Sequence, residues 1–252
     1  MSDLKNIRLL IEYEGTAYSG WQIQDNGDTI QGRLTDAIFR TTGQRVNLIG
    51  AGRTDAGVHA LGQVANFLID HRLEPERYAP ALNYYLRGDI RVLSSAEVPE
   101  GFHARFSAKS RQYRYLVSHE VSALYRNLRY QFRQHVDFGR LQDAAAKVLG
   151  ERDFSPFCVV ASRKENNVCR VEHSRWYRYG PLMVYEIRAN RFLHGMVRSL
   201  VGAMLNQTTL DPDDNELNLT PETFSDMLST PNGRRVAFTA PACGLYLVRV
   251  IY

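Results

Sequence analysis

Apolar side chains in the first hundred residues recur with two different periods. Strand-like apolar runs stand at 7–13, 44–49, 63–69 and 90–97. After the polar pair Asp28-Thr29, which is typical of a helix start, Ile30, Leu34, Ala37 and Ile38 fall on one helix face. A weaker helical pattern covers 75–86. The predicted order of elements is therefore β-α-β-β-α-β.

The second half of the chain repeats this order. Strands are predicted at 112–118, 169–179, 183–190 and 245–251, and helices at 140–149, closed by Gly150, and at 193–205. The turn Tyr179-Gly180-Pro181 separates the two central strands. Two split β-α-β units indicate a mixed α/β (α+β) protein with two ferredoxin-like or RNA-recognition-like halves, residues 1–105 and 106–252. Because no Gly/Ser linker separates the halves, we expect their largely antiparallel sheets to join around a central cleft.

A glycine-rich loop between two of the strands is the strongest candidate for chemistry. It reads Gly50-Ala51-Gly52-Arg53-Thr54-Asp55-Ala56-Gly57-Val58-His59-Ala60. Glycine tolerates positive φ and the close approach of a ligand, so a rigid turn here can present the Asp55 carboxylate and the Arg53 guanidinium. No phosphate-loop pattern is completed. The spacing alone fits a site and equally a connector in which Asp55 caps a turn; we expect His59 to be structural.

Composition excludes several classes of protein. With 252 residues, 44% of them hydrophobic, the chain can bury a substantial core. Asp3 and Lys5 stand where a signal peptide needs apolar residues, and no apolar run is long enough for a membrane helix, so we expect a cytoplasmic protein. Cys158, Cys169 and Cys243 are widely spaced and form no CxxC pair, which predicts buried thiols and no metal site.

Charge is distributed unevenly along the chain, although the net charge is only +4. Residues 101–135 hold one acid, Glu120, against seven basic residues with four interleaved tyrosines: Arg105, Lys109, Arg111, Arg114, Arg126, Arg129, Arg133, Tyr113, Tyr115, Tyr125 and Tyr130. This mixture fits a polyanion groove with stacking rings, and also a solvated face above core tyrosines. By contrast, residues 199–233 contain no Lys or Arg.

One predicted helix contains a residue that its pattern does not explain. Residues 196–205 are mostly apolar on all sides, which implies burial, yet Arg198 lies among them. An arginine there needs a partner or must reach solvent from the helix rim. Asp55 is a candidate partner, because the glycine-rich loop and this helix occupy equivalent ends of the two predicted halves.

Seven segments in order resemble the TruA family of tRNA pseudouridine synthases. They are Tyr13 to Gln22, Thr29 to Gly32, Gly50 to Ala60, Ala104 to Ala108, Arg111 to Tyr115, Arg191 to Arg198, and Pro241 to Leu247. The resemblance spans nearly the whole chain. It implies a duplicated α/β fold with a central cleft, a homodimer, no cofactor, and isomerisation of uridines at positions 38 to 40 of the tRNA anticodon arm.

The same resemblance implies roles for individual residues. Asp55 matches the catalytic aspartate, and Arg198 matches the arginine that pairs with it. Arg53 matches the arginine that helps to hold the flipped nucleotide, Tyr113 the tyrosine that stacks on the target uracil, and Leu245 the apolar residue beside the uracil. From the basic stretch we add Arg105 and Arg111 as expected RNA contacts. Isomerisation needs one ionised carboxylate and neither metal nor nucleotide, so no cofactor is expected.

One departure from the family pattern leaves the substrate open. Where the family usually continues with Val-Gly-x-Gly and a basic residue, this chain has Asn206 to Leu210 and then an acidic stretch through Leu219. Its run Asp213 to Glu216 is expected to be a solvated turn rather than a metal site. A paralogue with another RNA target, a non-catalytic RNA-binding protein and a metal-dependent nuclease or nucleotide hydrolase therefore stay as alternatives.

Overall fold

A computed structural model describes residues 4–163, 165–210, 219–230, 235–236 and 238–252. Its contacts divide the chain into two compact units, Met1–Lys109 with Tyr246–Tyr252, and Ser110–Leu245. The sequence analysis expected halves of 1–105 and 106–252. The last strand, predicted for the second half, belongs from Tyr246 onward to the first unit, because it pairs with a strand there.

The first unit is built on an antiparallel sheet. Its strands are β1 (Lys5–Tyr13), β2 (Ile49–Gly50), β3 (His59–Ile69), β4 (Ile90–Val98) and β10 (Leu245–Ile251). β4 pairs with β1 and β1 with β3, both antiparallel. One edge of β3 is shared: β2 pairs antiparallel with Ala65 and Asn66, while β10 pairs parallel with His59 and Ala60. The loop that carries Asp55 therefore joins β2 to the start of β3.

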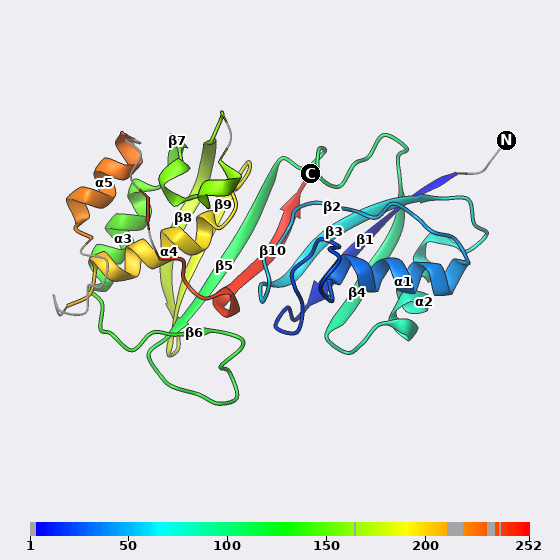
Figure 1. Ribbon diagram of the computed structural model, residues 1–252, viewed down its shortest axis with the longest axis horizontal. Coiled ribbons are helices and arrows are strands. Elements are labelled where there is room, and N and C mark those ends of the chain that lie inside the picture. The colour runs from blue at the N-terminus through cyan, green and yellow to red at the C-terminus, as the bar shows by residue number, and fades with distance from the viewer. Residues whose placement is uncertain (1–3, 164, 211–218, 231–234, 237) are drawn as a thin grey trace. The chain divides into compact units, whose positions relative to one another are not determined.

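Two helices cover one face of this sheet, α1 (Ile30–Thr42) and α2 (Tyr78–Tyr85) (Figure 1). The Thr29 side chain accepts the N–H of Gly32 at the start of α1, and Gly43, with φ of 73°, ends that helix. Ile7, Leu9 and Ile11 alternate along β1 and are fully buried. Phe67, the register partner of Ile7, packs edge-on against Tyr78 of α2 with ring centroids 5.7 Å apart. This face holds the main core of the unit.

Two buried asparagines organise the opposite face of the sheet. Asn6 of β1 donates to the carbonyls of Pro99, Glu100 and Phe102, at 2.9 to 3.2 Å. Asn66 of β3 donates to the Asn6 side-chain oxygen at 2.8 Å, and its own oxygen accepts the N–H of Ala104 at 2.8 Å. Because buried polar groups must be hydrogen-bonded, this pair fixes the chain that follows β4 against the sheet.

The strands of the second unit pair mainly antiparallel. Its strands are β5 (Ser110–Ser118), β7 (Gly150–Asp153), β8 (Val168–Tyr179) and β9 (Leu182–Ala189), with β6 (Tyr130–Gln131) parallel to β5. β9 lies between β5 and β8, and β7 pairs with β8. The predicted hairpin is confirmed, since β8 ends at Tyr179 and β9 begins at Leu182.

The described α-helices of this unit are α3 (Phe138–Lys147), α4 (Met196–Gln207) and α5 (Pro221–Ser229) (Figure 1). Every residue of α4 except Arg198 is buried, as the all-round apolar pattern predicted. The indole of Trp176 on β8 donates to the Met204 sulfur of α4 at 3.2 Å and packs on the Tyr185 ring, with centroids 5.1 Å apart. These contacts join the sheet to its central helix.

Several local features differ from the expectations. Of the predicted strand 44–49 only Ile49 pairs as a strand, together with Gly50, and the first turn of the predicted helix 75–86 is a 3-10 turn, Pro75–Arg77. Further 3-10 turns lie at Ser155–Phe157, Val160–Ser162 and Ala242–Gly244, and α5 was not predicted. Residues 211–218, which include most of the acidic stretch, lie outside the described residues. No described helix has the length and apolar character that crossing a membrane requires.

Removing the Asn66 side chain should destabilise the protein. Asn66→Ala leaves the buried N–H of Ala104 and the oxygen of Asn6 without the partner that Asn66 supplies, which costs about 1–3 kcal/mol of unfolding free energy. Urea denaturation measures this loss. Asn26→Ala, at an exposed position, is the control and should stay within about 0.5 kcal/mol of the parent protein. Equal stability of the two variants would contradict the role of the asparagine pair.

Candidate active site

Asp55 stands on a tight turn at the entrance to β3. Its carbonyl accepts the N–H of Val58 at 3.2 Å, and Gly57 within the turn has φ of 76°, a conformation that glycine adopts without strain. Asp55 is half-buried and Arg53 is exposed. The glycine-rich loop is thus a closed turn at Asp55 to Val58.

The segment from Tyr13 to Trp21 holds the first side of this turn. The N–H of Trp21 donates to the Thr54 carbonyl at 3.0 Å, and the hydroxyls of Tyr13 and Thr54 lie 2.8 Å apart in a buried hydrogen bond. Gly20, with φ of 90°, packs so closely on the loop that an added Cβ would stand 2.6 Å from the Thr54 carbonyl oxygen. The backbone directly before Asp55 is therefore fixed by three contacts from another segment.

The same segment, Tyr13 to Trp21, which we call the clamping segment, also holds the second side of the turn. The N–H of Gly15 donates to Nδ1 of His59 at 3.0 Å, and a Cβ at Gly15 would overlap the Val58 carbonyl. His59 is 1% exposed, and its ring stacks on Tyr246 of β10 with centroids 4.6 Å apart. Because Nδ1 accepts a hydrogen bond, it carries no proton in this arrangement. His59 joins the turn, the clamping segment and the last strand.

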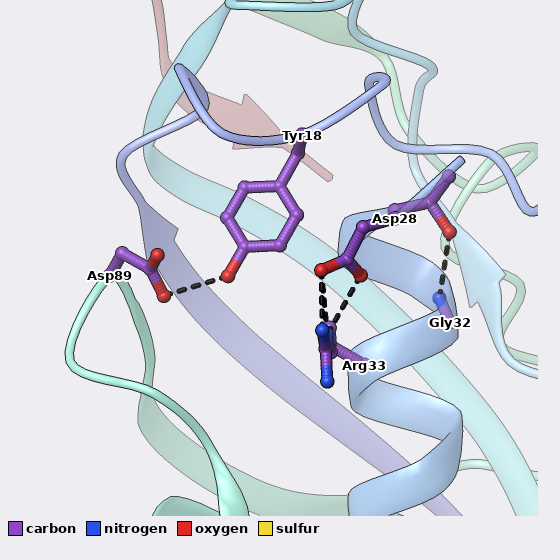
Figure 2. Close-up of polar contacts among 6 residues, drawn as sticks. Tyr18, Asp28, Gly32, Arg33 and Asp89 are labelled. Atoms are coloured by element: carbon purple, nitrogen blue, oxygen red, sulfur yellow. Dashed lines mark hydrogen bonds and ion pairs between the residues drawn. The ribbon is translucent and has the colours of Figure 1, made fainter.

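Figure 2 shows two side-chain contacts in and near the clamping segment. The Tyr18 hydroxyl donates to Asp89 at 2.7 Å, and burial together with this bond raises the pKa of Tyr18. The Arg33 guanidinium donates two-pronged to Asp28, with Nε 2.7 Å from Oδ1, and this bond lowers the pKa of the Asp28 carboxyl. The Tyr18 contact ties the segment to the loop before β4, whereas the Asp28–Arg33 pair lies outside the segment and joins the start of α1 to the residues before it.

The backbone beside Arg53 is open. Among the described residues no atom lies within 4 Å of a Cβ built at Gly52, whereas the Gly52 carbonyl is held by the Gln63 side chain at 2.9 Å. Ala51, at the start of the loop, packs in a small apolar cluster with Val64 and Ala104. Arg105, exposed, follows Ala104 directly. This cluster therefore joins the start of the Asp55 loop to the turn that carries Arg105.

The second unit collects the other predicted site residues around β5. Arg111 and Tyr113 lie two apart on this strand, so they share one face. Arg111 donates to the Asn190 carbonyl at 3.0 Å, and the buried Tyr113 ring meets Phe192 edge-on with centroids 5.0 Å apart. Phe192, which the sequence analysis did not single out, belongs to the turn that leads into α4. The signal that could have identified Phe192 is its position directly after Arg191 in the sequence.

Arg198 reaches the segment that follows α5. Its Nε donates to the Ala240 carbonyl at 2.7 Å, and the Ala240 N–H donates back to the Arg198 carbonyl at 3.2 Å. The next carbonyl, of Pro241, accepts the Tyr115 hydroxyl at 2.7 Å, and burial raises the pKa of Tyr115 well above its ordinary value. These bonds position the approach to Leu245, which is buried at the start of β10. Pairing of Arg198 with Asp55 stays a prediction.

Within the part of the chain that the structure describes, no group of three or more His, Cys, Asp or Glu side chains could hold a metal ion. The acidic run Asp213 to Glu216 lies outside that part. Cys158 and Cys169 are buried, as expected, and Cys243 is half-buried; burial raises the pKa of all three thiols.

Comparison with known proteins identifies the family. The family model described as tRNA pseudouridine synthase matches residues 9–107 and 144–252. The chain is 43% identical over 250 residues to a tRNA pseudouridine synthase A of Chlorobium luteolum, covering 99% of this chain and 96% of that protein. It is 40% identical to the protein of that name from Acetivibrio thermocellus, over 99% and 100% of the two chains. The matched residues contain both the clamped Asp55 turn and the Arg198 helix, and the chain belongs to the tRNA pseudouridine synthase family of isomerases.

Proposed function

We propose that this protein isomerises uridine to pseudouridine at positions 38 to 40 in the anticodon arm of tRNA, with Asp55 as the catalytic carboxylate. The observation that carries this proposal is the turn of Asp55, which is fixed on both sides by hydrogen bonds to the segment Tyr13–Trp21, while the backbone at Gly52 stays open. A pre-positioned carboxylate beside open backbone suits a reaction at a ribose that has left the helix stack.

The reaction requires little of the protein besides position. The bond from uracil N1 to ribose C1′ breaks, the base turns, and a bond from C5 to C1′ forms; C5 loses a proton and N1 gains one, so the product is an isomer of the substrate. No electron is gained or lost and no external group is transferred. Asp55 can begin the reaction as a nucleophile or as the base that removes a sugar proton, and both routes need the ionised carboxylate. A guanidinium close to it favours that state, which is the role we propose for Arg198.

The residues on β5 and at the start of β10 supply the base pocket in this proposal. Tyr113 has its ring fixed by Phe192, so it can confine the detached uracil without a loss of side-chain freedom on binding. Leu245, buried at the start of β10, provides an apolar wall, and Arg53, Arg105 and Arg111 contact the RNA backbone. The homodimer, the cytoplasmic location and the independence of metal and cofactor that the sequence predicts belong to the same proposal.

Two alternatives would give different products. A metal-dependent nuclease would shorten the RNA, and a non-catalytic RNA-binding protein would leave the uridines unchanged. A paralogue with another target would release the C5 proton from a different RNA. Each alternative is separated from the proposal by an assay on tRNA labelled with tritium at uridine C5.

Replacing Asp55 by asparagine should abolish isomerisation. Asp55→Asn keeps the size of the side chain but removes the carboxylate, so tritium release from labelled tRNA should fall by about a thousandfold or more. The parent protein should release tritium in the presence of EDTA without cutting the strand. Transcripts with single replacements at positions 38, 39 and 40 locate the target. Release by Asp55→Asn at the parent rate would disprove the assignment.

A side chain that displaces the backbone of the Asp55 turn should lower the catalytic rate more than it lowers the stability of the protein. Gly20→Ala places a Cβ 2.6 Å from the Thr54 carbonyl oxygen and displaces the backbone of Asp55. Gly43→Ala is the matched control, because Gly43 also has positive φ, 73°, but its Cβ meets nothing within 4 Å among the described residues. Both variants lose about 1–2 kcal/mol through backbone strain. The tritium-release rate at equal folded fraction should fall only for Gly20→Ala; equal rates would contradict the clamp.

The exposed Arg105 should contribute to the salt dependence of tRNA binding. Arg105→Gln removes one phosphate contact and should flatten the slope of log K against log salt by about 0.7–0.9. Arg140→Gln removes the same charge from α3, where the guanidinium faces Asp137 at 3.6 Å, and should leave the slope unchanged. Filter binding at several salt concentrations measures both. A slope unaffected by Arg105→Gln would remove this residue from the RNA contact surface.

A further inference from the structure

Phe106 is a large apolar side chain displayed to solvent on an otherwise polar turn. It is 75% exposed, and its neighbours Arg105 and Ser107 are exposed as well. We propose that the Phe106 ring, backed by His103, is a stacking platform for an unpaired base of the tRNA. This proposal deepens the proposed function and rests on it, because it adds a second RNA contact to the unit that carries Asp55.

The turn that displays Phe106 is already ordered. Nδ1 of His103 accepts the N–H groups of both Arg105 and Phe106 at 3.2 Å, and the Ser107 side chain accepts the N–H of His103 at 3.1 Å. The N–H of Ser107 donates back to the His103 carbonyl at 2.9 Å. A ring on such a turn loses little backbone freedom when a base settles on it.

The body of the unit holds the turn from beneath. Ala104 is fully buried; its N–H donates to Asn66, and its carbonyl accepts the Tyr252 hydroxyl at 2.8 Å. Asn6 binds the carbonyl of Phe102 at 2.9 Å. Hydrogen bonds at Phe102 and Ala104 therefore fix the backbone beneath Phe106, while its ring stays exposed.

The rings and charges around Phe106 suit a nucleobase. The His103 imidazole packs on Phe106 with centroids 4.4 Å apart and planes at 31°, and the Arg105 guanidinium carbon lies 5.5 Å from the ring centroid. A base stacked on an aromatic ring beside a guanidinium gains from stacking and from the attraction of its phosphate to the charge. A single ring flanked by polar residues is too small for a stable protein interface, which buries far more apolar area.

The position of the turn links the platform to the reaction. Ala104 packs in the same apolar cluster as Ala51, the second residue of the Asp55 loop, with Phe102 and Tyr252 at the edge of that cluster. Both features lie in one compact unit, so their separation does not depend on the other unit. The platform and the Asp55 loop are therefore carried by the same unit and share a support.

A tryptophan substitution tests stacking directly. The two native tryptophans, Trp21 and Trp176, are 1% and 0% exposed, so Phe106→Trp introduces the one exposed indole among the described residues. Titration with unmodified tRNA transcript should quench its fluorescence, because a stacked base quenches indole, and the Kd should stay within a few-fold of the parent value. Phe106→Leu keeps an apolar side chain without a π face and should weaken binding about five- to one-hundredfold.

Controls separate this proposal from its rivals. Tyr84→Leu removes another exposed ring, 83% exposed on α2, and should leave the Kd unchanged. All binding is measured in an Asp55→Asn background, so it reports the platform independently of catalysis; absence of tritium release by the parent protein would disprove the proposed function while leaving the binding result intact. An unquenched indole together with an unchanged Kd for Phe106→Leu would overturn the platform. A change in oligomeric state on light scattering, without a change in Kd, would assign the ring to a contact between chains and overturn it too.

Discussion

The hydrogen bond from the Trp21 N–H to the Thr54 carbonyl is the contact on which the arrangement of the candidate site depends. It joins two loops that are separate in the sequence, at the peptide that directly precedes Asp55. The close approach that allows this bond requires glycine at position 20, because a side chain would occupy the same space. Gly15 meets the same need on the other side of the turn. The backbone that carries Asp55 is therefore held by main-chain contacts in addition to the side chains of Tyr13 and His59.

The sheet of the first unit explains why the loop stands where it does. β2 occupies the edge of β3 only at Ala65 and Asn66, and β10 takes over the same edge at His59 and Ala60. After β2 the chain leaves the sheet and returns to it as β3, and Asp55 lies in the loop between these two strands. Because β2 and β10 share one edge of β3, a loop is needed at this point. Strand hydrogen bonds fix both ends of that loop.

Local sequence predicted the parts of this structure that depend on neighbouring residues. The pair Asp28-Thr29 and the spacing from Ile30 to Ile38 predicted α1, and Gly180-Pro181 predicted the hairpin. α5 also has a local signal, Thr220 as cap followed by Pro221, which the acidic character of the region obscured. The short length of β2 could not be predicted. The number of residues along 44–49 that pair as a strand is decided by which other strand competes for the edge of β3.

Partner choice for the site residues was equally beyond the sequence. The apolar residues around Arg198 indicated that its guanidinium needs a partner, but not which one. In the structure the Arg198 Nε donates to the main-chain carbonyl of Ala240. Likewise, His59 is structural as predicted, but its bond to Gly15 and its stack on Tyr246 depend on strands that the chain brings together late. Family resemblance named Asp55 and Arg198, whereas the structure supplied the segment that holds the Asp55 turn.

The stack of His59 on Tyr246 has a consequence for biosynthesis. The turn of Asp55 is made early, but the strand that completes the edge of β3 beside it comes from the last residues of the chain. A nascent chain that has emerged only as far as the second unit therefore lacks one wall of its own loop. In synthesis from the N-terminus, the edge of β3 beside the Asp55 turn therefore stays open until the whole second unit has been made, so this local structure depends on two distant parts of the chain.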